Sequence, residues 1–155
     1  MVIVKKLLMI IYIFFLIVTG GIMQSKLSKL QKEILIFVHK NKAKIRDYNP
    51  IVSIYDRRKN ERRGIEEVRP YLEVVYYHRL SYNFAKRFDK LIDGKYGKII
   101  KPSFSVSLSN SISALYKREL INLYYQSFNE TFLELTNEGI ETAKQLEQTS
   151  FDSSC

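Results

Sequence analysis

The sequence has few of the residues from which metal sites, disulfides and catalytic centres are built: one cysteine and two histidines among 155 residues. Because Cys155 is the single cysteine, no disulfide can form within the chain, which is compatible with a reducing compartment. His39 and His78 lie far apart and have no metal-ligand spacing. The serines that alternate from Ser103 to Ser113 are accompanied by no histidine or acid in a hydrolase pattern. We therefore expect no metal ion, no cofactor and no enzymatic activity.

Acidic residues are scarce in the middle of the chain. Residues 26–101 carry 20 Lys and Arg against 9 Asp and Glu, a net charge of +11, whereas residues 102–155 carry a net charge of −4. A basic excess favours polyanionic partners, namely DNA, RNA or an anionic membrane surface, although a merely solubilising surface gives the same composition. With 46% hydrophobic residues, the chain is expected to fold around one core as a single domain.

The longest apolar run is Leu7–Met23, which follows Lys5 and Lys6. Its 17 residues are at the short limit for a membrane-spanning helix. Two interpretations stay open for residues 1–23. They are either a membrane anchor, whose basic flank would keep residues 26–155 in the cytoplasm, or the product of a start codon assigned upstream of Met23. The second interpretation predicts a cytoplasmic protein without membrane contact.

Residues 24–147 are predicted to form the domain, with a basic insertion at about 41–70 and a disordered tail at 148–155. Apolar residues at three- and four-residue steps predict a helix over 24–40 and one helix or two over 71–92. Ser28 and Gln31 fit a capping box for the first helix, with Ser25 as the alternative N-cap. Residues 94–102 are expected to form a flexible, basic connector.

A third helix is predicted over 107–118, with Ser105 or Ser107 as its N-cap and with Leu108, Ile112 and Leu115 facing the core. Two strands, 122–125 and 131–135, follow around a polar turn. Thr136 is the predicted N-cap of a final helix that reaches about residue 146. The expected fold is mainly α with a small β-hairpin, which is an α+β class.

The order of helix, hairpin and helix in Ser103–Leu146 resembles the second half of prokaryotic winged helix-turn-helix transcriptional regulators. The serine-rich helix ends in Glu119-Leu120-Ile121, where those proteins have Gly-Leu-Ile or Gly-Leu-Val. Leu135-Thr136-Asn137-Glu138-Gly139 is similar to the Leu-Thr-x-x-Gly that follows their hairpin, the wing. The resemblance implies a winged helix-turn-helix fold, binding to double-stranded DNA and, in many relatives, a homodimer.

A helix with small polar residues on its outer face can enter a DNA major groove, which is about 12 Å wide. We therefore expect helix 107–118 to contact bases and the basic segments to contact phosphates. The base-side candidates are Ser107, Ser109, Asn110, Ser113 and Lys117. The backbone candidates are Arg57, Arg58, Lys59, Arg62, Arg63, Lys86, Arg87, Lys95, Lys98, Lys101 and Arg118.

The predicted wing also supports an alternative function. Its tip contains no Lys or Arg, and Glu130 is acidic. The helix carries Asn110 and Ala114 where many relatives have arginine. The alternative to a DNA-binding protein is therefore a winged-helix module for protein–protein contact, tethered to a membrane if residues 1–23 are genuine.

Overall fold

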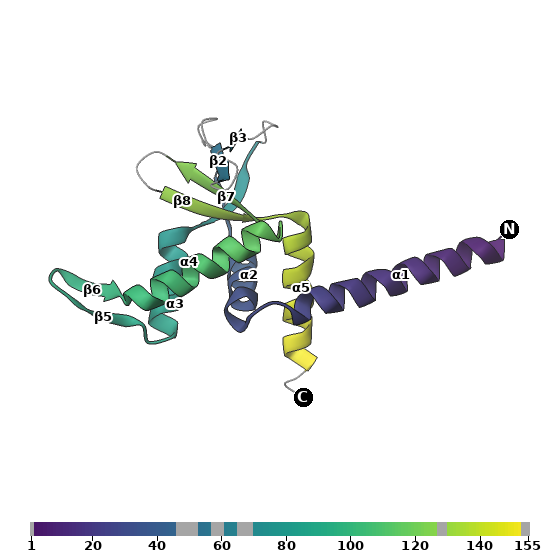
Figure 1. The fold of residues 1–155 in the computed structure, drawn as a ribbon, viewed down its shortest axis with the longest axis horizontal. Coiled ribbons are helices and arrows are strands. Elements are labelled where there is room, and N and C mark those ends of the chain that lie inside the picture. Colours follow the sequence, from purple (N-terminus) through teal and green to yellow (C-terminus); the bar gives the residue numbers. More distant parts are fainter. Residues whose placement is uncertain (1, 46–52, 57–60, 65–69, 127–129, 153–155) are drawn as a thin grey trace.

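A computed structural model of the chain describes residues 2–45, 53–56, 61–64, 70–126 and 130–152 (Figure 1). The helices within these ranges are α1 (Val2–Ser25), α2 (Lys29–Asn41), α3 (Tyr77–Arg87), α4 (Pro102–Lys117) and α5 (Asn137–Asp152). The strands are β1 (Ala43–Ile45), β2 (Ser53–Asp56), β3 (Glu61–Gly64), β4 (Leu72–Tyr76), β5 (Leu91–Gly94), β6 (Gly97–Ile100), β7 (Ile121–Gln126) and β8 (Glu130–Leu135).

Six strands form one antiparallel sheet in the order β1-β4-β8-β7-β2-β3, and β5 and β6 form a separate two-stranded hairpin. The expected α+β class is confirmed. The sheet is larger than the single hairpin predicted, because four further strands add to it. Strands β1, β2 and β3 lie in the segment expected to be an irregular basic insertion, and β4 lies in the segment expected to be a helix.

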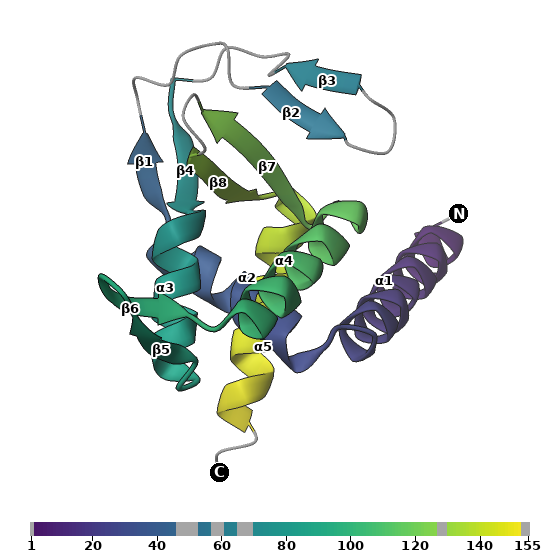
Figure 2. The ribbon, with the colours of Figure 1, turned by 60° about the vertical axis from the view of Figure 1, so that its left-hand side comes forward.

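One face of the sheet packs against helices α2 to α5, which lie together on one side of it (Figure 2). The predicted core positions of the third helix are confirmed, since Leu108, Ile112 and Leu115 are all buried. They pack in one cluster with residues from the other helices and from β8, among them Ile34, Leu35, Val38, Leu80, Phe84, Leu133, Ala143 and Leu146. This cluster fixes which side of α4 faces inward.

The opposite face of the sheet carries a second, smaller cluster. Leu72, Val74, Tyr124 and Phe132 are buried there, and the rings of Tyr124 and Phe132 are stacked with centroids 5.4 Å apart. Successive residues of β4 therefore belong to different clusters, since Val75 lies in the larger cluster and Val74 in the smaller.

The helix predicted over 71–92 is wrong in its first part and at its end. Residues 72–76 form strand β4, paired with β1 on one side and β8 on the other, because the run Leu-Glu-Val-Val-Tyr is buried on both faces of the sheet. The helix α3 covers only Tyr77–Arg87. The flexible connector expected over 94–102 is also wrong, because Leu91–Gly94 pairs with Gly97–Ile100.

The ends of the other helices refine the predictions. The capping box of Ser28 and Gln31 is confirmed, so α2 begins at Lys29, while residues 24 and 25 belong to α1. Helix α5 extends to Asp152, beyond the boundary at residue 147 where a disordered tail was expected.

Helix α1 projects from one side of the domain, and the β5–β6 hairpin projects from the other (Figure 1). Its contacts with the domain include residues of α5. The side chains from Ile3 to Phe14 are exposed. Across the ranges that the structure describes, no helix has both the length and the apolar character that a membrane span requires.

Candidate nucleic-acid interface

Helix α4 begins earlier than predicted. Pro102 occupies the first turn, where its fixed φ suits a helix and its missing N–H costs no hydrogen bond. The N–H groups of Phe104 and Ser105 donate to the carbonyl of Lys101. Ser107 is thus inside the helix, and its hydroxyl donates to the carbonyl of Ser103 at 3.0 Å. The N-terminus of this helix, expected at Ser105 or Ser107, lies instead at residues 101–103.

All five base-side candidates are exposed on α4: Ser107, Ser109, Asn110, Ser113 and Lys117. Asn110, Ser113 and Lys117 share its outer side, and Ser107 and Ser109 flank that side. Two residues outside the predicted set share this side. Val106 lies four residues before Asn110, and Ser103 lies three residues before Val106. Val106 is 59% exposed. The outer face of α4 is therefore a stripe of small residues ending in a cation: Ser103, Val106, Asn110, Ser113 and Lys117.

The C-terminal end of α4 turns sharply into β7. The N–H of Leu120 donates to the carbonyl of Leu115, and that of Glu119 donates to Tyr116, which is the Schellman arrangement. Glu119 takes the left-handed conformation with φ of 59°, at the position where the resemblance expects glycine. The side chain is exposed, so the turn accommodates it at the cost of local backbone strain.

The Leu-Thr-x-x-Gly segment holds this turn against α5. The hydroxyl of Thr136 donates to the Glu119 carbonyl at 2.7 Å and accepts from the Gly139 N–H at 3.0 Å, which confirms Thr136 as the N-cap. A Cβ at Gly139 would lie 2.0 Å from the carbonyl oxygen of Leu120. Glycine is therefore required for the close approach between α5 and the segment after α4.

The lysines of the connector are carried by the β5–β6 hairpin. Lys95, Lys98 and Lys101 are all exposed, and Lys98 forms an ion pair with Asp93 at 2.6 Å. Lys101 directly precedes α4, and its N–H donates to the carbonyl of Lys90. The hairpin is thus attached at its base to the start of α4.

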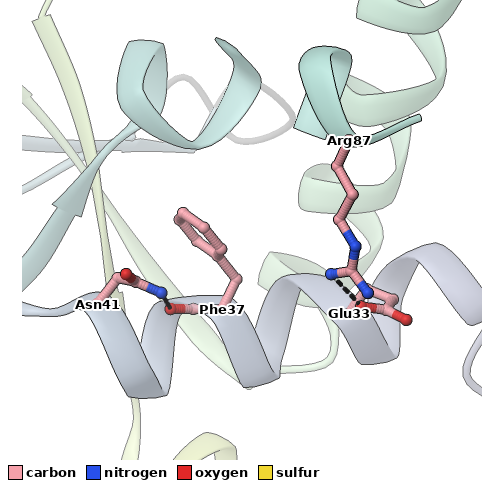
Figure 3. A network of polar contacts seen from close by, with 4 residues as sticks. All are labelled: Glu33, Phe37, Asn41 and Arg87. Carbon is pink, nitrogen blue, oxygen red and sulfur yellow. Dashed lines mark hydrogen bonds and ion pairs between the residues drawn. The ribbon is translucent and has the colours of Figure 1, made fainter. Parts of the chain in front are cut away.

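Besides Lys98, two further backbone candidates make contacts within the protein. Arg87 extends from α3 to the carboxylate of Glu33 on α2, 2.8 Å away (Figure 3). Arg118 donates to the carbonyl of Lys26 at 3.2 Å. A phosphate would compete with these partners. Lys86 and Lys117 are exposed and form no ion pair with any residue that the structure describes.

The remaining backbone candidates belong to the segment 57–63. Arg62 and Arg63 lie in β3, in register with Tyr55 and Ile54 of β2, so this part is a strand and not the loop expected. Arg57, Arg58 and Lys59 lie outside the described residues. Arg62 and Arg63 therefore lie on the edge strand of the six-stranded sheet, separated by β2 from β7, the strand that follows α4.

The β7–β8 hairpin is built around a buried carboxylate. Glu134 is only 6% exposed and accepts hydrogen bonds from the Tyr124 hydroxyl at 2.6 Å and the Asn122 amide at 3.2 Å. This polar cluster fixes the two strands to each other. Within the described ranges, no three His, Cys, Asp or Glu side chains gather as a metal site would need.

Comparisons with known proteins return no matching family model, no matching curated protein and no matching solved structure.

Proposed function

We propose that the protein is a winged helix-turn-helix DNA-binding protein, acting as a transcriptional regulator in the cytoplasm. The observation that carries the proposal is the outer stripe of α4, in which Ser103, Val106 and Asn110 are small or short and exposed. Such a surface allows a helix to approach base edges in a major groove without a steric clash. In this proposal, Asn110 and Lys117 are the side chains that select bases.

The arrangement around α4 supports the same proposal. When β1, β2, β3, β5 and β6 are set aside, the remaining elements follow the order α2, β4, α3, α4, β7, β8 and α5, which is compatible with a winged helix. The apolar residues on the inner side of α4 and the turn at Glu119 hold the helix rigidly against the core. Two features depart from the usual pattern. Strands β1, β2 and β3 stand between α2 and β4, and a β-hairpin occupies the place of the short turn between α3 and α4.

A binding experiment with the full chain tests this function. We expect selection from a random pool of duplex DNA to enrich a sequence that the protein binds, with an affinity that falls steeply between low and moderate salt. Replacing Asn110 by Ala should reduce discrimination against wrong bases by about 1–3 kcal/mol. The matched control, Asn137→Ala, removes an exposed amide from α5 and should leave discrimination unchanged.

A second candidate function is a winged-helix module that contacts another protein. It is favoured by the exposure of Val106 in the middle of the α4 stripe and by the contacts that Arg87 and Arg118 make within the chain. No detectable binding to duplex DNA at low salt would exclude the first function and leave this one.

A further inference from the structure

We propose that the β5–β6 hairpin is a second DNA-contacting arm, which places Lys95, Tyr96 and Lys101 against the phosphate backbone and minor groove beside the major groove occupied by α4. This inference rests on the proposed DNA-binding function. In this proposal, β5–β6 makes the backbone and minor-groove contacts that a charged wing usually makes. It lies at the opposite end of α4 from β7–β8 (Figure 1).

The hairpin is anchored at its base and free at its tip. The N–H of Lys101 donates to the carbonyl of Lys90 at 2.8 Å, and the N–H of Lys90 donates to Ala85 at 2.7 Å. Helix α3 also contacts β6. Because these bonds join the hairpin to the end of α3 and the start of α4, the direction of the arm is coupled to the orientation of α4.

The sequence of the turn places two side chains at the tip. Gly94 pairs with Gly97, so Lys95 and Tyr96 form the two-residue connection between the strands. Gly97 has φ of 130°, a conformation that suits glycine, and a Cβ at Gly94 would lie 2.8 Å from the Ile99 side chain. Tyr96 is consequently 92% exposed, the highest exposure among the large apolar residues that the structure describes as exposed.

The chemistry of the hairpin suits a nucleic acid. Lys95 at its tip and Lys101 at its base are exposed and form no ion pair with a described residue, while Asp93 is already paired with Lys98. Beside them, Ile92 and Ile99 face each other across the hairpin and are both exposed. Cations next to an exposed ring and apolar side chains are the combination that minor-groove-binding arms use, in which lysine contacts phosphate and an apolar group enters between base steps.

The length of the arm matches this placement. Each strand has four residues, which gives the hairpin a length of about 13 Å. The centres of adjacent major and minor grooves are about half a helical turn apart, or roughly 17 Å. With its side chains extended, the tip therefore reaches the phosphates bordering the groove next to α4.

The test compares three full-length variants for binding to the selected duplex at several salt concentrations. Lys95→Gln/Lys101→Gln should reduce the slope of log affinity against log salt by about 1.8, because two phosphate contacts are lost. Tyr96→Ala should weaken binding about tenfold at every salt concentration while the slope stays unchanged. Tyr96→Phe, which keeps the ring, should bind like the wild type.

The control is Lys5→Gln/Lys6→Gln, which removes the same charge from exposed residues of α1 at the far side of the molecule (Figure 1). If the wild type binds duplex DNA and the Lys95/Lys101 variant has the same salt slope as this control, the arm is refuted and the proposed function stands. The arm is also refuted if Tyr96→Ala binds like the wild type. If the wild type binds no duplex DNA at low salt, the proposed function itself fails.

Discussion

The two hairpins that flank α4 follow the same type of helix ending, but one is part of the large sheet and the other is exposed. Each follows a helix that ends in a Schellman arrangement with an acidic residue in the left-handed conformation, Asp89 before β5 and Glu119 before β7. The β7–β8 hairpin then joins a six-stranded sheet and buries Tyr124 and Glu134. The β5–β6 hairpin pairs with no other strand that the structure describes, and it exposes Tyr96 at its tip.

The β7–β8 hairpin therefore has a structural role in the sheet, whereas the β5–β6 hairpin presents side chains at the surface. A two-stranded hairpin is marginally stable alone in water, so β5–β6 depends on its attachment to α3 and α4. It contributes little to the core, and substitutions at its tip should leave the stability of the protein almost unchanged. Substitutions in or next to β7–β8 should destabilise the whole domain, because that hairpin is paired on both sides.

The largest effect is expected at Gly139, which supports β7–β8 through its contact with Leu120. Gly139→Ala should lower the free energy of unfolding by about 3 kcal/mol or more, because the new methyl group collides with backbone that cannot move independently. Urea titration followed by circular dichroism measures the change. The control on the same helix, Lys144→Ala, alters an exposed side chain and should stay within about 0.5 kcal/mol of the wild type. Equal stability of the two variants would contradict the close packing at Leu120.

A second prediction applies the same substitution to both hairpins. Tyr124→Phe removes a hydroxyl that donates to the buried carboxylate of Glu134, and should cost about 1.5–3 kcal/mol. Tyr96→Phe removes a hydroxyl from an exposed side chain and should cost nothing measurable. Thermal unfolding of both variants under identical conditions makes the comparison. A loss of stability in Tyr96→Phe as large as in Tyr124→Phe would show that β5–β6 is also part of the core.

The β7–β8 hairpin is predictable from the sequence and the β5–β6 hairpin is not, for a physical reason. The strands of β7–β8 are rich in aromatic and β-branched residues and are followed by the Thr136 cap, so several local signals agree. In β5–β6, only two apolar residues per strand flank Gly-Lys-Tyr-Gly, which has the composition of a polar connector. The strand β4 was missed because Leu72, Val75 and Tyr76 also fit the period of a helix.

The outer face of α4 was predictable, since the buried positions Leu108, Ile112 and Leu115 determine which residues point outward. The contacts of the basic side chains were not. Arg87 and Arg118 bind partners 54 and 92 residues away, and no local pattern indicates such pairs. The start of α4 was misplaced because several serines are suitable N-caps, whereas Pro102 favours an earlier start.

The smallest predicted effect concerns the shared helix ending and tests whether its strain is local. Glu119→Gly should raise the free energy of unfolding by about 0.5–1 kcal/mol, because relief of the left-handed strain exceeds the extra entropy of glycine in the unfolded chain. Asp89→Gly should give a similar gain at the entrance to β5–β6. Glu119→Ala keeps a Cβ and should give no gain. If Glu119→Gly destabilises the protein while Asp89→Gly stabilises it, the Glu119 side chain contributes to holding β7–β8. The two helix endings would then differ in the role of their acidic side chains, and not only in the exposure of the hairpin that follows.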